Sequence, residues 1–219
     1  RYLHHPDDVF HELLPQFTPL LDDTRRRARL IFLALLHDCG KPATRSDEGG
    51  RVHFYRHERA GAEIAGQLCR RMRVSSADTR ATTSVIRLHL RPLQLMHARS
   101  RGELSGKAMI RFFDDAGDDL LDILALALAD KSAGGGPAAE PDVQERLRDL
   151  YRALFAFYRE RYLPALERPL LTGTDLTQRL QYAPGPRVGQ LLQRARNLQI
   201  EGMLTTRDEA LRWAEKTRH

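Results

Sequence analysis

The residues most able to do chemistry lie together at positions 37–41, where a histidine and an aspartate are followed by a lysine. His37 and Asp38 close an apolar run with helical spacing, and Gly40 with Pro42 predicts that the helix ends there. Neighbouring side chains inside a helix diverge by about 100°, so such a pair can share one metal ion only at a helix end. These residues predict metal-assisted phosphoester hydrolysis. The alternative is a helix end stabilised by polar caps.

Three further residues of metal-ligand type lie near the ends of helical stretches, namely His57, His89 and Asp130. Asp130 closes a strongly apolar run, where an unpaired carboxylate would be costly to bury. We therefore expect it to face a metal, a cation or solvent, and an ion pair with Lys131 or an arginine is the alternative. The recurrence of such residues at helix ends is more specific than the His37–Asp38 pair alone.

Composition is that of a globular protein with a basic surface. The chain has 219 residues, of which 42% are hydrophobic, and this length can bury a substantial core in one or two domains. A net charge of +6 and a pI near 9.7 suit a polyanionic partner such as RNA. Nearly all of the excess is arginine, so genomic codon bias is an alternative source. For the arginine-rich stretch 24–29 a solvated helix face is favoured over an RNA-binding patch.

The chain lacks sequence signals for export or membrane insertion. Cys39 and Cys69 are too few for a disulfide framework or a thiolate zinc site, which fits a reducing cytoplasm. No apolar run reaches about 18 residues and no signal-type segment opens the chain. Because the sequence begins at Arg1 without methionine, we expect a fragment or a processed product.

Apolar periodicity predicts an all-α fold. Spacings of three and four residues predict helices over residues 9–21, 25–37, 59–73, 78–89, 107–116 and 119–131. Residues 44–55 contain Gly49 and Gly50 and alternating apolar positions; a hairpin is possible there, but we expect a loop.

A glycine- and proline-rich stretch predicts the domain organisation. We place a linker at residues 134–141, between a helical domain over 1–133 and a smaller helical module over 142–219. In the module we expect a long helix over 142–162 that ends at Pro164, then a helix from Pro186 to Glu201. Thr206 and Glu209 predict a capping box for a final helix.

Several segments carry a family resemblance. Residues 35–42, 54–58, 87–92 and 128–130 resemble the HD phosphohydrolase domain found in the C-terminal half of bacterial tRNA nucleotidyltransferases and poly(A) polymerases. Residues 169–176, 185–189, 199–202 and 206–210 are similar to the segments that close those proteins. The resemblance covers nearly the whole chain in the right order. It implies an HD-domain helical bundle followed by a small C-terminal helical module.

The resemblance also implies an activity and its requirements. We expect a metal-dependent phosphatase and 2′,3′-cyclic phosphodiesterase acting on RNA 3′ ends, tRNA or nucleotides. The mixed imidazole and carboxylate ligands favour a divalent ion such as manganese, nickel, cobalt, iron or magnesium. No membrane partner is expected.

Roles for individual residues follow from the same resemblance and from ligand chemistry. His37, Asp38 and Asp130 would hold the metal, and Lys41 would offset charge on the phosphoryl oxygens. His57 and His89 would complete a second metal position or act on substrate oxygens and the leaving group. Arg91 is a candidate phosphate clamp, with a solvent-exposed arginine as the alternative.

One position departs from the family pattern. The first metal histidine of the family usually lies one residue further along, where this chain has Glu12, and His11 directly follows Phe10. Either His11 or Glu12 would supply that ligand, or the site is weakened.

Two other functions compete with the hydrolase. One is a non-catalytic RNA-binding body with a degenerate site, which the Glu12 position supports. The other is the hydrolase half of an RNA end-healing enzyme. Nucleotide addition is not expected from this chain, because the paired aspartates at 7–8, 22–23, 114–115 and 118–119 lie in helical or turn contexts rather than on strands.

Overall fold

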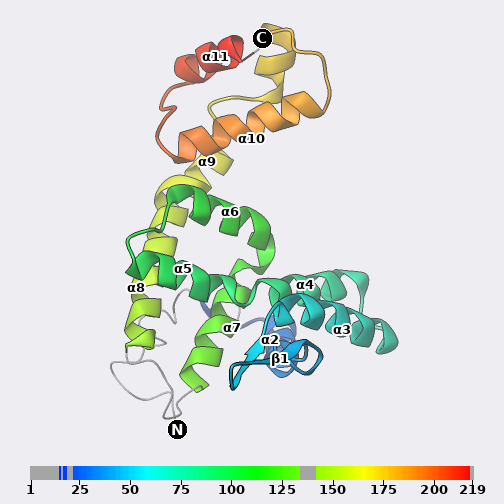
Figure 1. Cartoon of the computed structure of the whole chain (residues 1–219). Helices are drawn as coiled ribbons and strands as arrows, with labels where there is room; N and C mark the ends of the chain where they lie inside the picture. The colour runs from blue at the N-terminus through cyan, green and yellow to red at the C-terminus, as the bar shows by residue number, and fades with distance from the viewer. Residues whose placement is uncertain (1–14, 16, 19–21, 134–141, 218–219) are drawn as a thin grey trace. The chain divides into compact units, whose positions relative to one another are not determined.

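The computed structural model describes residues 15, 17–18, 22–133 and 142–217 (Figure 1). Helices make up almost all of the regular structure in these residues, so the predicted all-α class is confirmed. The chain forms two compact units, one of residues 1–104 and 112–150, the other of residues 105–111 and 151–219. The expected linker at 134–141 lies outside the described residues, and a domain boundary there stays a prediction.

Apart from the segment 91–100, the helices of the first unit lie within a few residues of the predicted ranges. They are α2 (Thr24–Leu36), α3 (His57–Arg71), α4 (Ser76–Leu88), α5 (Arg91–Ser100) and α7 (Leu120–Ala133), with short 3₁₀ turns η1 (Pro42–Thr44) and η2 (Gly117–Asp119). Helix α6 (Gly106–Ala116) belongs to both units. Helix α7 is apolar on all sides and lies in the core, and α2, α4 and α5 pack against it. Within the described residues, none of these helices is long and apolar enough to cross a membrane.

The expectation of a loop at 44–55 is wrong. Strands β1 (Arg45–Glu48) and β2 (Arg51–Phe54) pair antiparallel, with Arg45 opposite Phe54. Gly49 and Gly50 form the two-residue turn, and both have positive φ, +61° and +76°. Glycine adopts this backbone without steric cost, which is why the sequence can close so tight a hairpin.

Helix α5 follows α4 with little connecting chain and was not anticipated. Pro92 occupies the first turn of α5, where its missing N–H costs no hydrogen bond. Leu95 and Met96 bury one face of the helix. The Arg-Pro pair therefore opens a helix, although the sequence was interpreted there as a phosphate-binding segment.

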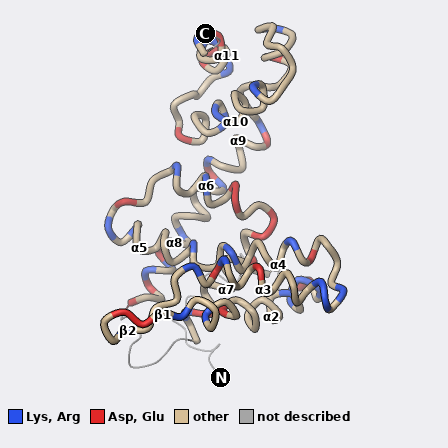
Figure 2. Tube along the Cα trace, turned by 45° about the vertical axis from the view of Figure 1, so that its right-hand side comes forward, with Lys and Arg blue, Asp and Glu red and all other residues tan. Residues whose placement is uncertain are grey.

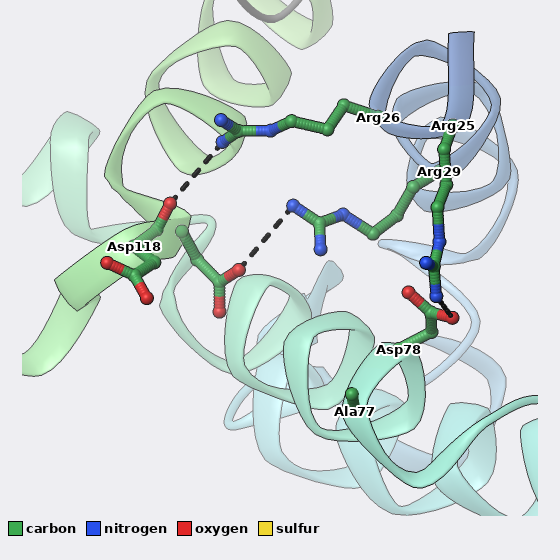
Figure 3. A pocket seen from close by; sticks show the side chains of 7 residues that line it. Arg25, Arg26, Arg29, Ala77, Asp78 and Asp118 are labelled. Carbon is green, nitrogen blue, oxygen red and sulfur yellow. Dashed lines mark hydrogen bonds and ion pairs between the residues drawn. The ribbon is translucent and has the colours of Figure 1, made fainter. Parts of the chain in front are cut away.

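The expected solvated face at the start of α2 holds for Arg25 and Arg27, which are exposed, but not for Arg26 and Arg29, which pair with a buried carboxylate. Arg26 and Arg29 both donate to Asp122, at 2.8 and 2.7 Å, and the Asp122 side chain is fully buried in α7. Arg25 reaches Asp78 of α4 at 2.6 Å. Figure 3 shows the hollow of about 360 Å³ that these arginines line together with acidic residues. Because its cations are matched by carboxylates, this cluster fastens α2 to α4 and α7.

The helices from residue 143 onward belong to the second unit, except that the first of them is shared, since residues up to 150 lie in the first unit. Helix α8 (Val143–Phe157) continues through a π-helical turn (Tyr158–Tyr162) into α9 (Leu163–Glu167), and Pro164 lies in the first turn of α9. The expected end at Pro164 is therefore wrong, because the proline opens a new helical turn. Helices α10 (Pro186–Ile200) and α11 (Arg207–Lys216) follow, and the Thr206–Glu209 capping box is confirmed.

A buried carboxylate organises the turn before α10. Asp175, in the π-helical turn Asp175–Arg179, is 4% exposed and accepts hydrogen bonds from the backbone and hydroxyl of Thr172 and from Arg207. Burial raises the pKa of this carboxyl, but the donors outweigh burial and hold the pKa below its ordinary value. Asp175 thus ties its own turn to the start of α11.

We expect Asp175→Asn to lower the free energy of unfolding by about 1–2 kcal/mol at neutral pH, because the charge-assisted bonds are lost. The folded pKa lies below the unfolded one, so this stabilisation is present above about pH 4 and is lost as the pH falls through the folded pKa. In urea titrations the wild type and the variant should therefore converge between neutral pH and about pH 3. A difference that does not change with pH would contradict this role.

Candidate metal centre

Five side chains that the sequence singled out converge in the first unit. His37 directly follows α2 and Asp38 comes next, His57 opens α3, His89 follows α4, and Asp130 lies in the last turns of α7. Potential ligand atoms of His37, Asp38 and Asp130 all lie within 4.8 Å of one another, and so do those of Asp38, His57 and His89. Asp38 belongs to both groups, so the five side chains form one centre.

Each of the three histidines is oriented by a nearby backbone carbonyl, which belongs to the preceding helix turn for His37 and His89 and to the end of β2 for His57. The Nδ1 atoms of His37, His57 and His89 lie 2.9, 2.9 and 2.6 Å from the carbonyl oxygens three residues earlier. A carbonyl oxygen can only accept, so each Nδ1 carries the hydrogen and donates it. In the neutral ring this leaves a lone pair on Nε2, which is the arrangement seen in metal-binding histidines.

The Nε2 atoms point into the centre without a satisfying partner. All three are buried and make no hydrogen bond to the described residues. The His89 ring lies 5.4 Å from the His37 ring and 5.3 Å from the His57 ring, measured between centroids. Buried polar atoms are normally paired, and two of these nitrogens face only carboxylate oxygens while His89 Nε2 has no partner among the described residues, so a cation fits at this place.

The spacing of the ligand atoms supports the same fit. His37 Nε2 lies 3.2 Å from Asp38 Oδ2 and 3.4 Å from Asp130 Oδ1, and His57 Nε2 lies 3.3 Å from Asp38 Oδ1. Neighbouring ligands about 2.1 Å from one ion are separated by roughly 3.0–3.4 Å in octahedral or tetrahedral coordination. The observed separations match these edges.

The electrostatics of the centre favour positive charge beside His37. The carboxylates of Asp130 and Asp38 raise the pKa of His37 to about 10. Burial raises the pKa of Asp38, but His37 and Lys41 outweigh it and the pKa falls below its ordinary value. Burial lowers the pKa of His89, which keeps this ring neutral. The site therefore combines a negatively charged half with a neutral imidazole half.

The remaining predicted site residues lie at different places. Lys41 Nζ contacts Asp38 Oδ2 at 2.6 Å, and Lys131 contacts Asp130 at 3.3 Å, as the ion-pair alternative for Asp130 anticipated. Arg91 opens α5 and donates to Gln94 at 3.2 Å, and no contact to the five-residue centre is seen among the described residues. His11 and Glu12 lie outside the described residues, so the choice between them stays a prediction.

A close backbone contact shapes the loop that carries Asp38, and sequence analysis missed it. A Cβ atom at Gly40 would lie 2.1 Å from the carbonyl oxygen of His57 and 2.5 Å from the backbone nitrogen of Gly61. Only glycine lets the loop approach α3 this closely. The sequence signal was present in Gly40 and in the small residues Gly61 and Ala62, but their contact is long-range.

We expect Gly40→Ala to move the loop that carries Asp38 away from α3, which carries His57. The added methyl group meets backbone atoms that cannot rotate away, so the free energy of unfolding should fall by about 1–3 kcal/mol or more. Binding of a divalent ion, followed by calorimetry, should weaken with it. Gly189→Ala is the matched control, since nothing lies within 4 Å of a Cβ there and alanine favours the helix. Undiminished metal binding in Gly40→Ala would contradict this role.

Comparison with known proteins gives the family of this centre. Residues 14–134, more than half of the chain, match the HD domain. The chain belongs to the HD domain family. Metal-dependent phosphohydrolysis is characteristic of this family.

Two relatives extend the similarity beyond the HD domain. The A-adding tRNA nucleotidyltransferase of Deinococcus radiodurans is 33% identical over 228 aligned residues, covering 97% of this chain and 48% of the relative. The CC-adding tRNA nucleotidyltransferase of Thermus thermophilus is 32% identical, covering 92% of this chain and 41% of the relative. The HD-domain chain therefore spans less than half the length of the curated relatives it matches, and the homology includes the second unit.

Proposed function

We propose that this chain is a metal-dependent phosphohydrolase that acts on phosphate esters at RNA ends or on nucleotides, as a phosphatase and 2′,3′-cyclic phosphodiesterase. The observation that carries the proposal is the convergence of three unpaired Nε2 atoms on two carboxylates. A solvated polar cap, the simpler interpretation of the His37–Asp38 pair, would leave these atoms open to water instead of burying them.

In this proposal His37, Asp38 and Asp130 hold the ion, because these three supply both carboxylates and an imidazole whose ligand atoms lie within 4.8 Å of one another. Nitrogen and oxygen ligands suit manganese, nickel, cobalt, iron or magnesium. When bound, such an ion polarises phosphoryl oxygens and lowers the pKa of water. His11 or Glu12 would add a further ligand.

The other residues of the centre would act on the substrate. His57 and His89 present Nε2 lone pairs held in place by their Nδ1 hydrogen bonds, so they can accept a proton from an attacking water or orient the leaving oxygen. Lys41 is 40% exposed and can turn its ammonium from Asp38 towards a phosphoryl oxygen. Arg91 would contact a more distant phosphate.

RNA is the proposed substrate partner for two reasons. Both relatives are named for action on tRNA, and the chain carries 35 basic against 29 acidic residues. A non-catalytic RNA-binding body would share these two features, but it would not require buried, unpaired histidine nitrogens.

The test is a metal analysis of the purified chain followed by hydrolysis of adenosine 2′,3′-cyclic phosphate with manganese, nickel or magnesium. We expect bound divalent metal in stoichiometric amount and turnover that a chelator abolishes and added metal restores. A chain that binds no divalent ion and leaves the cyclic phosphate intact would instead be the non-catalytic body.

A further inference from the structure

A groove on the first unit remains unexplained by the metal centre. Its volume is about 460 Å³, and its lining comes from one face of α4 and from α6: Arg80, Thr83, Ser84, Arg87, Leu88 and Asp115. The α4 residues recur at three- and four-residue spacing, so they form a stripe along the helix. The opposite face of α4 carries Thr82, Val85 and Ile86, which are buried. The stripe is therefore the outward face of this helix.

The two arginines of the groove are available for a ligand. Arg80 and Arg87 are exposed, and neither makes an ion pair with any residue that the structure describes. The arginines of α2 contrast with them, because those are matched by Asp78 and Asp122. Figure 2 shows further basic positions along α3. Free guanidinium groups beside hydroxyls suit phosphate oxygens.

The acidic residue of the groove, Asp115, limits the kinds of ligand that the groove can bind. Asp115 places a carboxylate in the same groove, where it would repel a free phosphate or an anionic lipid headgroup. A carboxylate can, however, accept a hydrogen bond from a ribose 2′-hydroxyl, which distinguishes RNA from DNA. Arg80 and Arg87 are separated by about 10 Å along the helix, so they can contact two different phosphates of one strand.

We propose that this groove binds the sugar–phosphate backbone of an RNA strand, with Arg80 and Arg87 on phosphates and Asp115 on a ribose hydroxyl. Arg87 lies two residues before His89, about 3 Å along the helix axis, although the two side chains point about 200° apart around it. The bound segment would be the part of the RNA that precedes its reacting end. Only this position of the bound segment relative to the reacting end rests on the proposed function, because binding of the RNA backbone requires no hydrolysis.

The experiment measures binding of a fluorescein-labelled RNA of about twelve nucleotides by anisotropy, with DNA of the same sequence in parallel, from about 50 to 300 mM salt. We expect Arg80→Gln/Arg87→Gln to weaken RNA binding about tenfold or more and to make the log K against log salt slope shallower by about 1.4, which is two contacts at about 0.7 each. Asp115→Ala should reduce the preference for RNA over DNA. Both substitutions are at exposed positions, and thermal unfolding checks that the fold is intact.

Two controls make the result specific. Arg80→Lys/Arg87→Lys keeps the charge and should retain most of the salt slope, whereas Arg101→Gln/Arg168→Gln removes the same charge at exposed positions elsewhere and should leave binding unchanged. An unchanged slope in the Arg80/Arg87 glutamine variant would overturn the proposal. The proposal would also be overturned if the glutamine variant lost its binding to phosphatidylserine vesicles but kept its binding to RNA.

Hydrolysis separates this inference from the proposed function. Adenosine 2′,3′-cyclic phosphate has no neighbouring nucleotide to occupy the groove, so the Arg80/Arg87 variant should hydrolyse it at the wild-type rate. If the wild type fails to hydrolyse it but the RNA-binding differences hold, the proposed function fails and the groove stands. If hydrolysis proceeds and the RNA-binding differences are absent, the groove proposal is wrong and the proposed function stands.

Discussion

Asp38→Ala is expected to reduce hydrolysis of a 2′,3′-cyclic nucleotide by about a hundredfold or more, as loss of a metal ligand does. One oxygen of this carboxylate lies near His37 and Lys41, the other near His57. Its removal therefore takes a ligand from both groups at once. The metal content of the purified variant should fall with its activity.

The control for this prediction is Asp47→Ala, which removes an exposed carboxylate from the hairpin that precedes His57. We expect it to keep wild-type metal content and turnover. An Asp38→Ala protein that is folded, retains its metal and turns over at the control rate would remove the basis of the catalytic proposal.

Asp122→Ala is expected to lower the free energy of unfolding by about 3 kcal/mol or more, because breaking a buried ion pair leaves charge without compensation. The Asp122 side chain is fully buried, and Arg29, which donates to it, is only 18% exposed. Without the carboxylate, Arg26 would have no carboxylate partner among the described residues, and Arg29 would keep only Asp119, at 3.6 Å. Urea unfolding followed by circular dichroism measures the change.

Asp78→Ala supplies the comparison, because its partner Arg25 is 74% exposed. Such exposed pairs contribute about 0–1 kcal/mol, so this variant should unfold close to the wild type. A second comparison replaces the whole buried cluster, Arg26→Met/Arg29→Met/Asp122→Leu, and should recover much of the lost stability. Equal effects of Asp78→Ala and Asp122→Ala would show that burial does not set the strength of these pairs.

The convergence of candidate ligands could be predicted because their positions follow from local rules. His37 and His89 close helices whose apolar periodicity is plain in the sequence, and Asp130 closes the most apolar helix of all. Helix ends are where side chains can gather around one point. The family resemblance then indicated which of these helix ends come together. Their individual roles stay predictions.

Other features depend on long-range contacts that no local pattern encodes. The buried partner of Arg26 and Arg29 lies more than ninety residues away, so an arginine-rich helix start could not be distinguished from a solvated face. The clash that makes glycine necessary at position 40 involves α3, which follows a hairpin. A loop was preferred to the hairpin because the apolar alternation is confined to Val52 and Phe54 of the second strand, while the first strand is wholly polar.

The backbone hydrogen bond at each histidine Nδ1 has a consequence for design. Every imidazole is oriented by a carbonyl only three residues away. The orientation of each ring therefore depends on a segment of four residues and not on the surrounding scaffold. Transplanting such a segment into an unrelated helical protein should therefore preserve the tautomer and the orientation of the ring. Only the meeting point of the transplanted segments would have to be engineered.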